Sequence, residues 1–480
     1  AIDLGAESGR VILARFDGQQ LDLQEMHRFP NRPLTLHGHR FWNMTGLWDE
    51  TLVGLRKARQ VAGMLDSIGV DTWGVDYGLV DSHGSLAGNV YQYRDSRTDG
   101  MMEQVFARVP RDVLYRRTGI QFLPFNTLFQ LYAHEQMQPG ELARAHRLLL
   151  IPDLLHGWLC GSQVCERTNA TTTQCWDPIA GAWARDMLEQ LSIPTTMLPP
   201  VVEPGTLLGE VLPQWQDDFG KARVIAPATH DTGSAIAATP AKLASGWGYI
   251  SSGTWSLVGV ELAQPVMTPD ALAANCTNEG GVFGTTRFLK NVMGLWLLQE
   301  CQRSFARNGQ SIDYDALLAK VSSVPTFTAL IDPDDPRFLA PPDMPEAINT
   351  YLSEHGQTPL SDPAAFAHCI LESLVLRYCE VFQYIQQLTN TGVHVVHVLG
   401  GGARNARLNQ WLADALDVPV IAGPFEATAR GNALMQLVGL GELQSLEEVR
   451  AVAQRAPTQT FSPNGAHHAA WKEAGQRFNV

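Results

Sequence analysis

The chain has 480 residues, of which 45% are hydrophobic and 18% are charged. This balance is ordinary for a globular protein and argues against intrinsic disorder. Because the length exceeds what a single hydrophobic core usually organises, we expect two domains. The formal net charge of -14 disfavours a broad surface for nucleic acid or for an anionic membrane, but it leaves open a local site for a small anionic ligand.

The 7 cysteines are scattered along the chain and form no CxxC pair, so we expect reduced structural thiols in a cytoplasmic protein. The most apolar run, residues 148–160, is short and is interrupted by Pro152 and Asp153, which is not typical of a membrane span. We identify no signal-peptide pattern. The chain opens with Ala1 inside an apparent strand, so we expect a start methionine and a few strand residues before it.

Short β-rich runs alternate with helical patterns throughout, which predicts an α/β fold. Residues 9–29 are predicted to form a hairpin with its turn at Asp17-Gly18, and residues 67–86 two strands separated by a polar break. Helices are expected to dominate between about 100 and 190. The Pro- and Gly-rich residues 193–213 are expected to be irregular or edge strand.

The second half begins with a layout like that of the first. Residues 246–266 are predicted to form a strand, a turn of Ser, Gly and Thr, and a returning strand, which repeats the pattern of residues 1–16 and suggests two related halves. Residues 288–300 are predicted to form an apolar helix with Asn291 at its start and Gln299 two turns later.

The last part of the chain contains one long helical pattern and several glycine-rich turns. An irregular segment over 322–347 precedes a predicted helix over 363–389. Residues 393–405 are predicted to form a strand, a glycine loop and the start of a helix. Residues 423–436 are predicted to form a turn and a small-residue helix, in which Gly431 would allow a close approach to another backbone, as would Ala433.

Two turns have the composition of phosphate-binding loops. In DLGAESGR (3–10), the backbone N–H groups of a tight turn can bind phosphate oxygens, Asp3 can hold a divalent cation through water, and Arg10 can neutralise phosphate charge. An ordinary β-turn that begins with Asp explains the same residues. The turn SSGTWS (251–256) is similar but has no carboxylate.

Three further motifs have both a functional and a structural explanation. The glycines of VLGGGARN (398–405) could let a flat ligand lie against the backbone, or they could simply form a tight turn from a strand to a helix. The motif does not fit the dinucleotide-binding pattern G-x-G-x-x-G. DTWGVD (71–76) suits sugar recognition through Trp and Gly74, or is an ordinary strand end. In THDTGS (229–234), Asp231 is either a catalytic base or, with Thr232, a helix cap.

In this combination and order, the motifs resemble the FGGY carbohydrate kinases, whose fold is a duplicated actin/hexokinase-like (ribonuclease H-like) ATPase fold. The resemblance covers the chain from Asp3 to about Gln436. It extends to the branch that phosphorylates L-rhamnulose, through the segments DTWGVDYGLVD (71–81), YRDSRT (93–98), GIQFLPFNTLFQL (119–131), NATTTQ (169–174), THDT (229–232), YISSGTWSL (249–257), NEGG (278–281) and LKNVMGLWLLQ (289–299).

The resemblance implies two such domains with an interdomain cleft. We expect residues 1–235 to bind the sugar and to carry the first phosphate loop, and residues 236–480 to bind the nucleotide. It also implies the reaction, which is transfer of phosphate from MgATP to the C1 hydroxyl of L-rhamnulose in L-rhamnose breakdown. The partners are then these two small molecules, with no nucleic acid and no membrane, and no oligomeric state is indicated.

The resemblance assigns roles to residues that match the family motifs. The ATP-binding residues would be Ala6, Glu7, Ser8, Gly9, Arg10, Thr254, Gln299 and Gly401. The ketose-binding residues would be Gly74, His230, Asp231, Thr232 and Asn291. Asp231 would accept the proton, with a pKa near the ordinary aspartate value, and Asp3 would support Mg²⁺. The family usually has a hydroxyl residue where this chain has Glu7, so a carboxylate here is expected to affect nucleotide affinity.

Three alternatives remain open at this stage. A kinase of the same fold that acts on L-fuculose, L-xylulose or glycerol would share the ATP motifs. An actin-like ATPase without a sugar substrate would turn over ATP in the absence of sugar. A Rossmann oxidoreductase, suggested by the three glycines, would bind NAD(P)H, but the glycine spacing and the late position of the motif argue against it.

Overall fold

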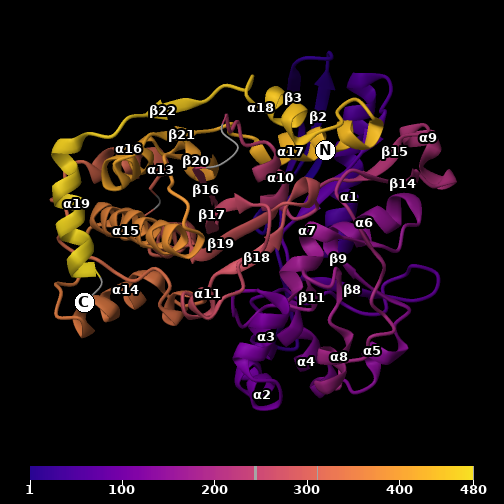
Figure 1. The fold of residues 1–480 in the computed structure, drawn as a ribbon, viewed down its shortest axis with the longest axis horizontal. Helices are drawn as coiled ribbons and strands as arrows, with labels where there is room; N and C mark the ends of the chain where they lie inside the picture. Colours follow the sequence, from indigo (N-terminus) through magenta and orange to yellow (C-terminus); the bar gives the residue numbers. More distant parts are fainter. Residues whose placement is uncertain (243–245, 311, 479–480) are drawn as a thin grey trace. The chain divides into compact units, whose positions relative to one another are not determined.

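The computed structural model describes residues 1–242, 246–310 and 312–478. Its contacts divide the chain into two compact units, which can be followed by colour in Figure 1. The first unit comprises Ala1–Lys242, Glu261–Leu289 and Glu426–Ala456, and the second comprises Leu243–Val260, Lys290–Phe425 and Pro457–Val480. The domain boundary at residue 235 stays a prediction. None of the helices in the described ranges has the length and hydropathy needed to cross a membrane.

The first unit has an α/β architecture with many short strands. Its strands are β1 (Ile2–Leu4), β2 (Ser8–Phe16), β3 (Leu21–Pro30), β4 (Leu34–Leu36), β5 (His39–Phe41), β6 (Ser67–Ile68), β7 (Val70–Thr72), β8 (Tyr77–Val80), β9 (Arg147–Leu150), β10 (Cys165–Glu166), β11 (Trp176–Asp177), β12 (Ala182–Trp183), β13 (Val201–Val202), β14 (Thr206–Glu210), β15 (Arg223–Ala226) and β18 (Thr277–Gly280). Its helices are α1 (Met44–Ala62), α2 (Met101–Arg108), α3 (Arg111–Thr118), α4 (Thr127–Met137), α5 (Glu141–Arg144), α6 (Ile151–Cys160), α7 (Arg167–Ala170), α8 (Arg185–Gln190), α9 (Gln216–Phe219), α10 (Asp231–Ala237), α11 (Pro269–Ala273), α17 (Ala427–Leu440) and α18 (Leu446–Ala453).

The main sheet of the first unit has the strand order β3-β2-β1-β7. β2 and β3 form the hairpin predicted for residues 9–29, and Gly18 takes a positive φ of 91° at its turn, which glycine adopts without strain. β1 is antiparallel to β2 and parallel to β7. The helix α1 packs on β2 and β3, and begins where the Asn43 side chain accepts the N–H of Gly46 (3.1 Å).

The second unit contains a larger sheet and longer helices. Its strands are β16 (Trp247–Ser252), most of β17 (Trp255–Leu262), the end of β19 (Thr286–Met293), β20 (Val395–Gly400), β21 (Val420–Ala422) and β22 (Gln459–Phe461). Its helices are α12 (Trp296–Arg307), α13 (Tyr314–Val321), α14 (Met344–Glu354), α15 (Pro363–Thr389), α16 (Ala406–Leu416) and α19 (Gly465–Phe478). α15 is the helix predicted over 363–389, and α12, α13, α16 and α19 pack against it (Figure 1).

The two sheets share a layout, as the sequence suggested. In the first, β1 pairs antiparallel with β2 and parallel with β7. In the second, β16 pairs antiparallel with β17 and parallel with β20. Each unit therefore begins with a hairpin, and the first strand of that hairpin also pairs in parallel with a strand much later in the chain, β7 in the first unit and β20 in the second.

The helix predicted over residues 288–300 is wrong for its first half. The strand β19 runs to Met293, and the helix α12 begins only at Trp296. Phe288, Leu289 and Val292 are fully buried in the strand, and their spacing also fits one face of a helix, so periodicity alone does not separate the two. The direction changes at Gly294, where a Cβ would lie 2.7 Å from the Trp255 carbonyl carbon.

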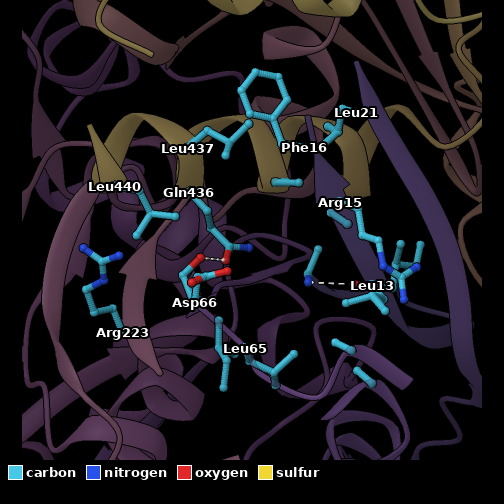
Figure 2. A pocket seen from close by; sticks show the side chains of 18 of the residues that line it. Leu13, Arg15, Phe16, Leu21, Leu65, Asp66, Arg223, Gln436, Leu437 and Leu440 are labelled. Atoms are coloured by element: carbon cyan, nitrogen blue, oxygen red, sulfur yellow. Dashed lines mark hydrogen bonds between the residues drawn. The ribbon is translucent and has the colours of Figure 1, made fainter. Parts of the chain in front are cut away.

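A cavity of about 600 Å³ lies beside β2, β6 and α17 in the first unit, and Figure 2 shows the side chains around it. Its walls are mainly aliphatic, from Leu13, Leu21, Leu65, Leu437 and Leu440. On one side, Ser67 Oγ of β6 donates to Gln436 Oε1 of α17 (2.8 Å). None of the predicted site residues lines this cavity, so the candidate site lies elsewhere.

Candidate active site

Three carboxylates of the first unit lie at the carboxyl ends of neighbouring parallel strands. Asp3 of β1 is directly opposite Asp71 of β7. Thr72, the next residue of β7, forms a parallel bridge with His230, which precedes Asp231. The carboxyl ends of parallel strands are where open α/β sheets bind their ligands. This strand arrangement therefore gathers Asp3, Asp71 and Asp231, which are far apart in the sequence, at one edge.

The predicted phosphate loop, residues 6–10, covers the end of the tight turn between β1 and β2 and the first three residues of β2. The Gly5 N–H donates to Ser8 O (2.9 Å) across the turn. Asn31 braces it from both sides, because its N–H donates to Glu7 O (3.0 Å) and its Nδ2 donates to Gly5 O (2.9 Å). The Glu7 side chain is exposed, so water can solvate its carboxylate.

Arg10 links the turn to two carboxylates. Its guanidinium forms ion pairs with Asp3 and with Glu426, the residue at the start of α17. Asp3 itself is buried. Asp71 is fully buried, and its pKa is raised well above the ordinary value by that burial and by the charge of Asp3. Arg10 is therefore the cation that balances this group of acids in the first unit.

Asp231 is the first residue of α10, and His230 is its N-cap. Asp231 Oδ1 accepts the N–H of Thr232 (2.5 Å) and lies 3.2 Å from Thr232 Oγ1. Asp231 and Thr232 lie inside the first turn of α10, and the N-cap residue His230 makes no side-chain cap hydrogen bond, so the prediction that Asp231 or Thr232 caps the helix is wrong. The prediction of an ordinary pKa is wrong, because burial raises the pKa of Asp231, the charge of Asp3 raises it further, and His230 only partly opposes this.

His230 is held by a buried ion pair that the sequence analysis did not identify. Arg287, which is wholly buried, places Nη2 3.1 Å from His230 Nδ1. Glu279 stands opposite Arg287 in the β18–β19 pair, and its Oε2 lies 3.1 Å from Arg287 Nη1 and 3.3 Å from His230 Nδ1. Because a guanidinium can only donate, the Arg287 contact favours an accepting Nδ1 and a ring proton on Nε2, whereas the Glu279 carboxylate beside the same nitrogen favours the opposite tautomer. Nε2 in turn lies 3.5 Å from Asp231 Oδ1.

A second buried carboxylate, Glu166, fixes the backbone before His230. Its Oε2 accepts the N–H and the hydroxyl of Thr229, both at 2.8 Å. Its Oε1 accepts the N–H of Thr168 (2.7 Å), and Thr168 Oγ1 accepts the N–H of His230 (3.2 Å). Burial raises the pKa of Glu166, and these hydrogen bonds oppose the rise. The network sets the position at which α10 begins.

The helix α17 supports both α10 and β7. A Cβ at Gly431 would lie 2.5 Å from the carbonyl carbon of Ser234, so the glycine allows α17 to touch the α10 backbone, as predicted. Asn432 Nδ2 donates to Asp71 Oδ2 (2.5 Å) and to Gly69 O (3.2 Å). Ala433 is buried in the cluster that α17 forms with α18.

Gly74 lies in a strained loop above a buried acid. The next residue, Val75, has a φ of 68°, which is rare for a β-branched residue. The Val75 carbonyl accepts Thr127 Oγ1 (2.6 Å), which helps hold this conformation. Asp76 accepts the indole N–H groups of Trp42 (2.6 Å) and Trp73 (3.0 Å), and burial raises its pKa to about 6. Strain of this kind is typical of functional sites.

In the second unit, the predicted nucleotide residues lie around the β16–β17 turn. Thr254 O accepts the N–H of Gly294 (3.1 Å), so the start of α12 sits on this turn. Gln299 follows on α12, and its Oε1 is buried without a hydrogen-bond partner among the described residues. The glycine loop approaches the same hairpin, because a Cβ at Gly400 would lie 2.7 Å from Ser252 O. Gly401 is the next residue of that loop.

Asn291, the fifth predicted ketose residue, lies half-buried in β19 rather than at the start of a helix. The sequence analysis missed Glu166, Arg287 and Asn432 and assigned no role to Glu279. Glu279 lies in the NEGG segment, and Asn432 in the small-residue helix, so motifs pointed to both. No signal in the sequence singled out Glu166 or Arg287.

The described residues contain no group of three or more His, Cys, Asp or Glu side chains spaced to hold a metal ion by themselves. All seven cysteines are free thiols, and five of them are buried.

Comparison with known proteins identifies the family. The N-terminal domain model of the FGGY family of carbohydrate kinases matches residues 1–237, and the C-terminal domain model matches residues 248–440. A rhamnulokinase of Pectobacterium carotovorum subsp. carotovorum is 44% identical over 96% of this chain and 92% of its own length. A rhamnulokinase of Bacteroides thetaiotaomicron is 40% identical over 99% of this chain and 97% of its own.

The chain belongs to the FGGY family of carbohydrate kinases. Solved structures support the two-domain fold of this FGGY kinase. A xylulose kinase from Lactobacillus acidophilus matches with a TM-score of 0.82 at 16% identity, over 100% of this chain and 96% of that one. A Plasmodium falciparum glycerol kinase matches with a TM-score of 0.78 at 15% identity, over 100% and 98%. At these identities the likeness concerns the fold alone.

Proposed function

We propose that this FGGY kinase transfers the γ-phosphate of ATP to the C1 hydroxyl of L-rhamnulose, giving L-rhamnulose 1-phosphate and ADP. The observation that carries the proposal is the identity of 40–44% to curated rhamnulokinases over nearly the whole chain. The xylulose and glycerol kinases of known structure share the fold at only 15–16% identity. Ketose specificity depends on pocket residues rather than on the fold, so sequence identity is the better guide.

In this reaction, Asp231 accepts the proton of the attacking hydroxyl. Its Oδ1 holds the N–H of Thr232, so we assign the other oxygen, Oδ2, to the substrate. Phosphoryl transfer needs positioning and charge stabilisation more than covalent chemistry, and a carboxylate fixed at a helix start supplies the positioning. His230 Nε2–H, set by Arg287, donates either to Asp231 or to a ketose hydroxyl.

The ligand contacts follow the motifs. We assign the ketose to Gly74, His230, Asp231, Thr232 and Asn291. We assign ATP to Ala6, Glu7, Ser8, Gly9, Arg10, Thr254, Gln299 and Gly401. Gln299 Oε1 is buried and has no hydrogen-bond partner within the described ranges, which supports a ligand contact at that position, because a buried amide oxygen normally has a partner.

The residues at the strand ends fit a magnesium ion that arrives with ATP. Mg²⁺ is usually held by one or two carboxylates together with phosphate oxygens and water. Asp3 would supply one carboxylate, and Asp71 Oδ1 beside it is buried without a hydrogen-bond partner in the described part of the chain. When bound, the ion would neutralise charge on the phosphates. Arg10, already paired with Asp3, would stay in reach of the same charge.

A panel of acceptors with MgATP and coupled detection of ADP tests the proposal. We expect L-rhamnulose to give the highest kcat/KM among L-rhamnulose, L-fuculose, L-xylulose and glycerol. A higher kcat/KM with another acceptor would assign the chain to another branch of the family. Equal ATP turnover without any acceptor would instead support an actin-like ATPase.

A further inference from the structure

Residues 73–76, which we call the ketose loop, follow β7 and include Gly74, the residue assigned to the ketose. At the centre of the loop, Val75 has a φ of 68°, in the left-handed region that is unfavourable for a β-branched side chain. A backbone in this region persists only where the surrounding structure holds it. The groups that hold Val75 therefore decide how the ketose loop presents Gly74.

Two threonine hydroxyls hold the two peptide groups of Val75. Thr127, the first residue of α4, donates from Oγ1 to Val75 O (2.6 Å). Thr172 Oγ1 accepts the Val75 N–H (3.3 Å), and its own proton is donated to Asn169 O (2.8 Å). Both threonines are buried, so removing either hydroxyl would leave a backbone group of Val75 without this partner and away from water.

Thr172 also contacts Gly74 directly. A Cβ at Gly74 would lie 3.0 Å from Thr172 Oγ1 and 3.3 Å from Thr172 Cγ2, so this side chain packs closely against the bare backbone of the ketose loop. Thr172 lies in the 3₁₀ helix Thr171–Thr173. The helix just before it, α7, contains Thr168, whose hydroxyl accepts the His230 N–H (3.2 Å). One short segment therefore contacts the backbone at both Gly74 and His230, and both are assigned to the ketose.

A buried amide of α4 strengthens the hold on the ketose loop. Gln130 Nε2 donates to Asp76 Oδ1 (2.9 Å) and lies 3.4 Å from Val75 O. Gln130 Oε1 accepts from Arg97 Nη2 (2.7 Å), which fixes the orientation of the amide. Because Thr127 and Gln130 are three residues apart on α4, they lie on the same side of the helix, and that side contacts the ketose loop.

We propose that Thr127 and Thr172 are positioning residues for the ketose, because they hold the ketose loop in the left-handed conformation in which Gly74 meets the sugar. This role rests on the proposed function, which places the ketose at Gly74. Neither threonine needs to touch the sugar, since each acts through the backbone of Val75. A loop held in this way is preorganised, so the ketose does not have to order it on binding. Loss of either hydroxyl should therefore weaken ketose binding and leave ATP binding and proton transfer intact.

Steady-state kinetics with MgATP, in which the ketose and ATP are varied in turn, tests the proposal. Thr172→Val removes the hydroxyl but keeps the volume. The matched control is Thr173→Val, in the same 3₁₀ helix. Thr173 Oγ1 makes the same two kinds of bond, to Ala170 O (2.6 Å) and from the Cys175 N–H (3.1 Å), but neither bond reaches the ketose loop. We expect Thr172→Val to raise the KM for the ketose about tenfold or more, while kcat and the KM for ATP stay within about threefold of the wild type. Thr173→Val should leave all three values within about threefold.

Thr127 provides a second pair of variants, which keeps the test valid if Thr172→Val does not fold. Thr127→Val should also raise the KM for the ketose about tenfold, and Thr127→Ser, which keeps the hydroxyl, should restore it. The control is Thr51→Val, because Thr51 is equally buried and donates to Leu47 O (2.7 Å) inside α1. An unchanged KM for the ketose in Thr172→Val or Thr127→Val, an equal rise in either control, or an equal rise in the KM for ATP would overturn the proposal.

The same assay separates this role from the proposed function. The acceptor used is the one that the wild type phosphorylates with the highest kcat/KM. If that acceptor is not L-rhamnulose, the substrate assignment fails, while the comparison of variants still decides the role of the two threonines. If L-rhamnulose is preferred and the valine variants bind it as the wild type does, only the positioning role is overturned.

Discussion

Replacing Gly431 with alanine tests whether helix α17 positions Asp231, the proposed catalytic base. The new Cβ would lie 2.5 Å from the carbonyl carbon of Ser234 and closer still to its oxygen, whereas real Cβ contacts essentially never fall below 3.0 Å. The neighbour is backbone, so α10 and α17 must move apart. Ser234 is three residues after Asp231 in a seven-residue helix, so we expect the movement to reach the Asp231 carboxylate. A displacement on the order of 1 Å at such a group costs about 100-fold in rate.

The assay is steady-state kinetics of Gly431→Ala with L-rhamnulose and MgATP, together with thermal unfolding. We expect kcat to fall about 100-fold and the unfolding free energy to fall by about 1–3 kcal/mol, as for other overpacked sites. The matched control is Gly475→Ala, another glycine inside a helix, where the nearest atom to a new Cβ is 3.9 Å away. That variant should keep wild-type kcat. A wild-type kcat in Gly431→Ala would refute the claim that this helix contact positions Asp231.

Three further predictions follow from the same unit. Asp231→Asn should lower kcat by about 10²–10⁴ while ketose binding is retained. In the wild type, kcat should fall at acid pH with a midpoint above the ordinary aspartate pKa of 3.8, because the base must be ionised and its pKa is raised. Arg287→Lys keeps a positive charge beside Glu279 but loses the planar set of guanidinium donors. We therefore expect kcat to fall more than tenfold. We also expect ¹⁵N NMR to show that the His230 ring is no longer a single Nε2–H tautomer. Burial raises the pKa of Asp76 from 3.8 to about 6, so the folded state takes up a proton in this window that the unfolded chain does not. The free energy of urea unfolding of the wild type relative to Asp76→Asn should therefore rise by about 3 kcal/mol as the pH falls from above 6 to below 3.8.

Each of these has a clear contrary result. Activity of Asp231→Asn near that of the wild type would remove it as the base. An unchanged His230 spectrum in Arg287→Lys would mean that another group sets the tautomer. A difference between the wild type and Asp76→Asn that does not vary with pH would show that the pKa of Asp76 is the same in the folded and the unfolded chain.

Local signals in the sequence predicted the elements whose ends are marked by particular residues. The β2–β3 hairpin turns at Asp17-Gly18, and α15 begins at Pro363, whose missing N–H and fixed φ suit a first helical turn. The pattern failed where residues 288–300 pass from a buried strand to a helix, because the apolar positions on either side of Lys290 and Asn291 fit one face of a helix as well as a buried strand. The change from strand to helix occurs at Gly294, where the chain makes a close contact with the β16–β17 turn.

The candidate site was predictable as far as its motifs extend. Asp231 and His230 stand in one motif at the end of an apolar run, so their proximity follows from the sequence. Arg287 reaches His230 only because β18 and β19 pair in the register that sets Glu279 opposite it. Glu166 acts through Thr229, 63 residues away in the chain. Such tertiary partners leave no periodic or local signal in a single sequence.

The same limit applies to ionisation. An aspartate in a polar motif was predicted to keep its ordinary pKa, but burial and a neighbouring acid decide the value. The charge of Asp3 reaches Asp231 because the two follow neighbouring strands of the fold. Spacing along the chain does not contain this information.

The most direct test of the central claim is the position of the phosphate on the product. L-rhamnulose is incubated with the kinase and MgATP, and the product is analysed by NMR with ³¹P–¹H correlation. We predict a single new phosphorus signal coupled to the C1 methylene protons, with one ADP formed for each ketose consumed. Coupling to a proton on any other carbon, or ADP release without a phosphorylated ketose, would contradict the account.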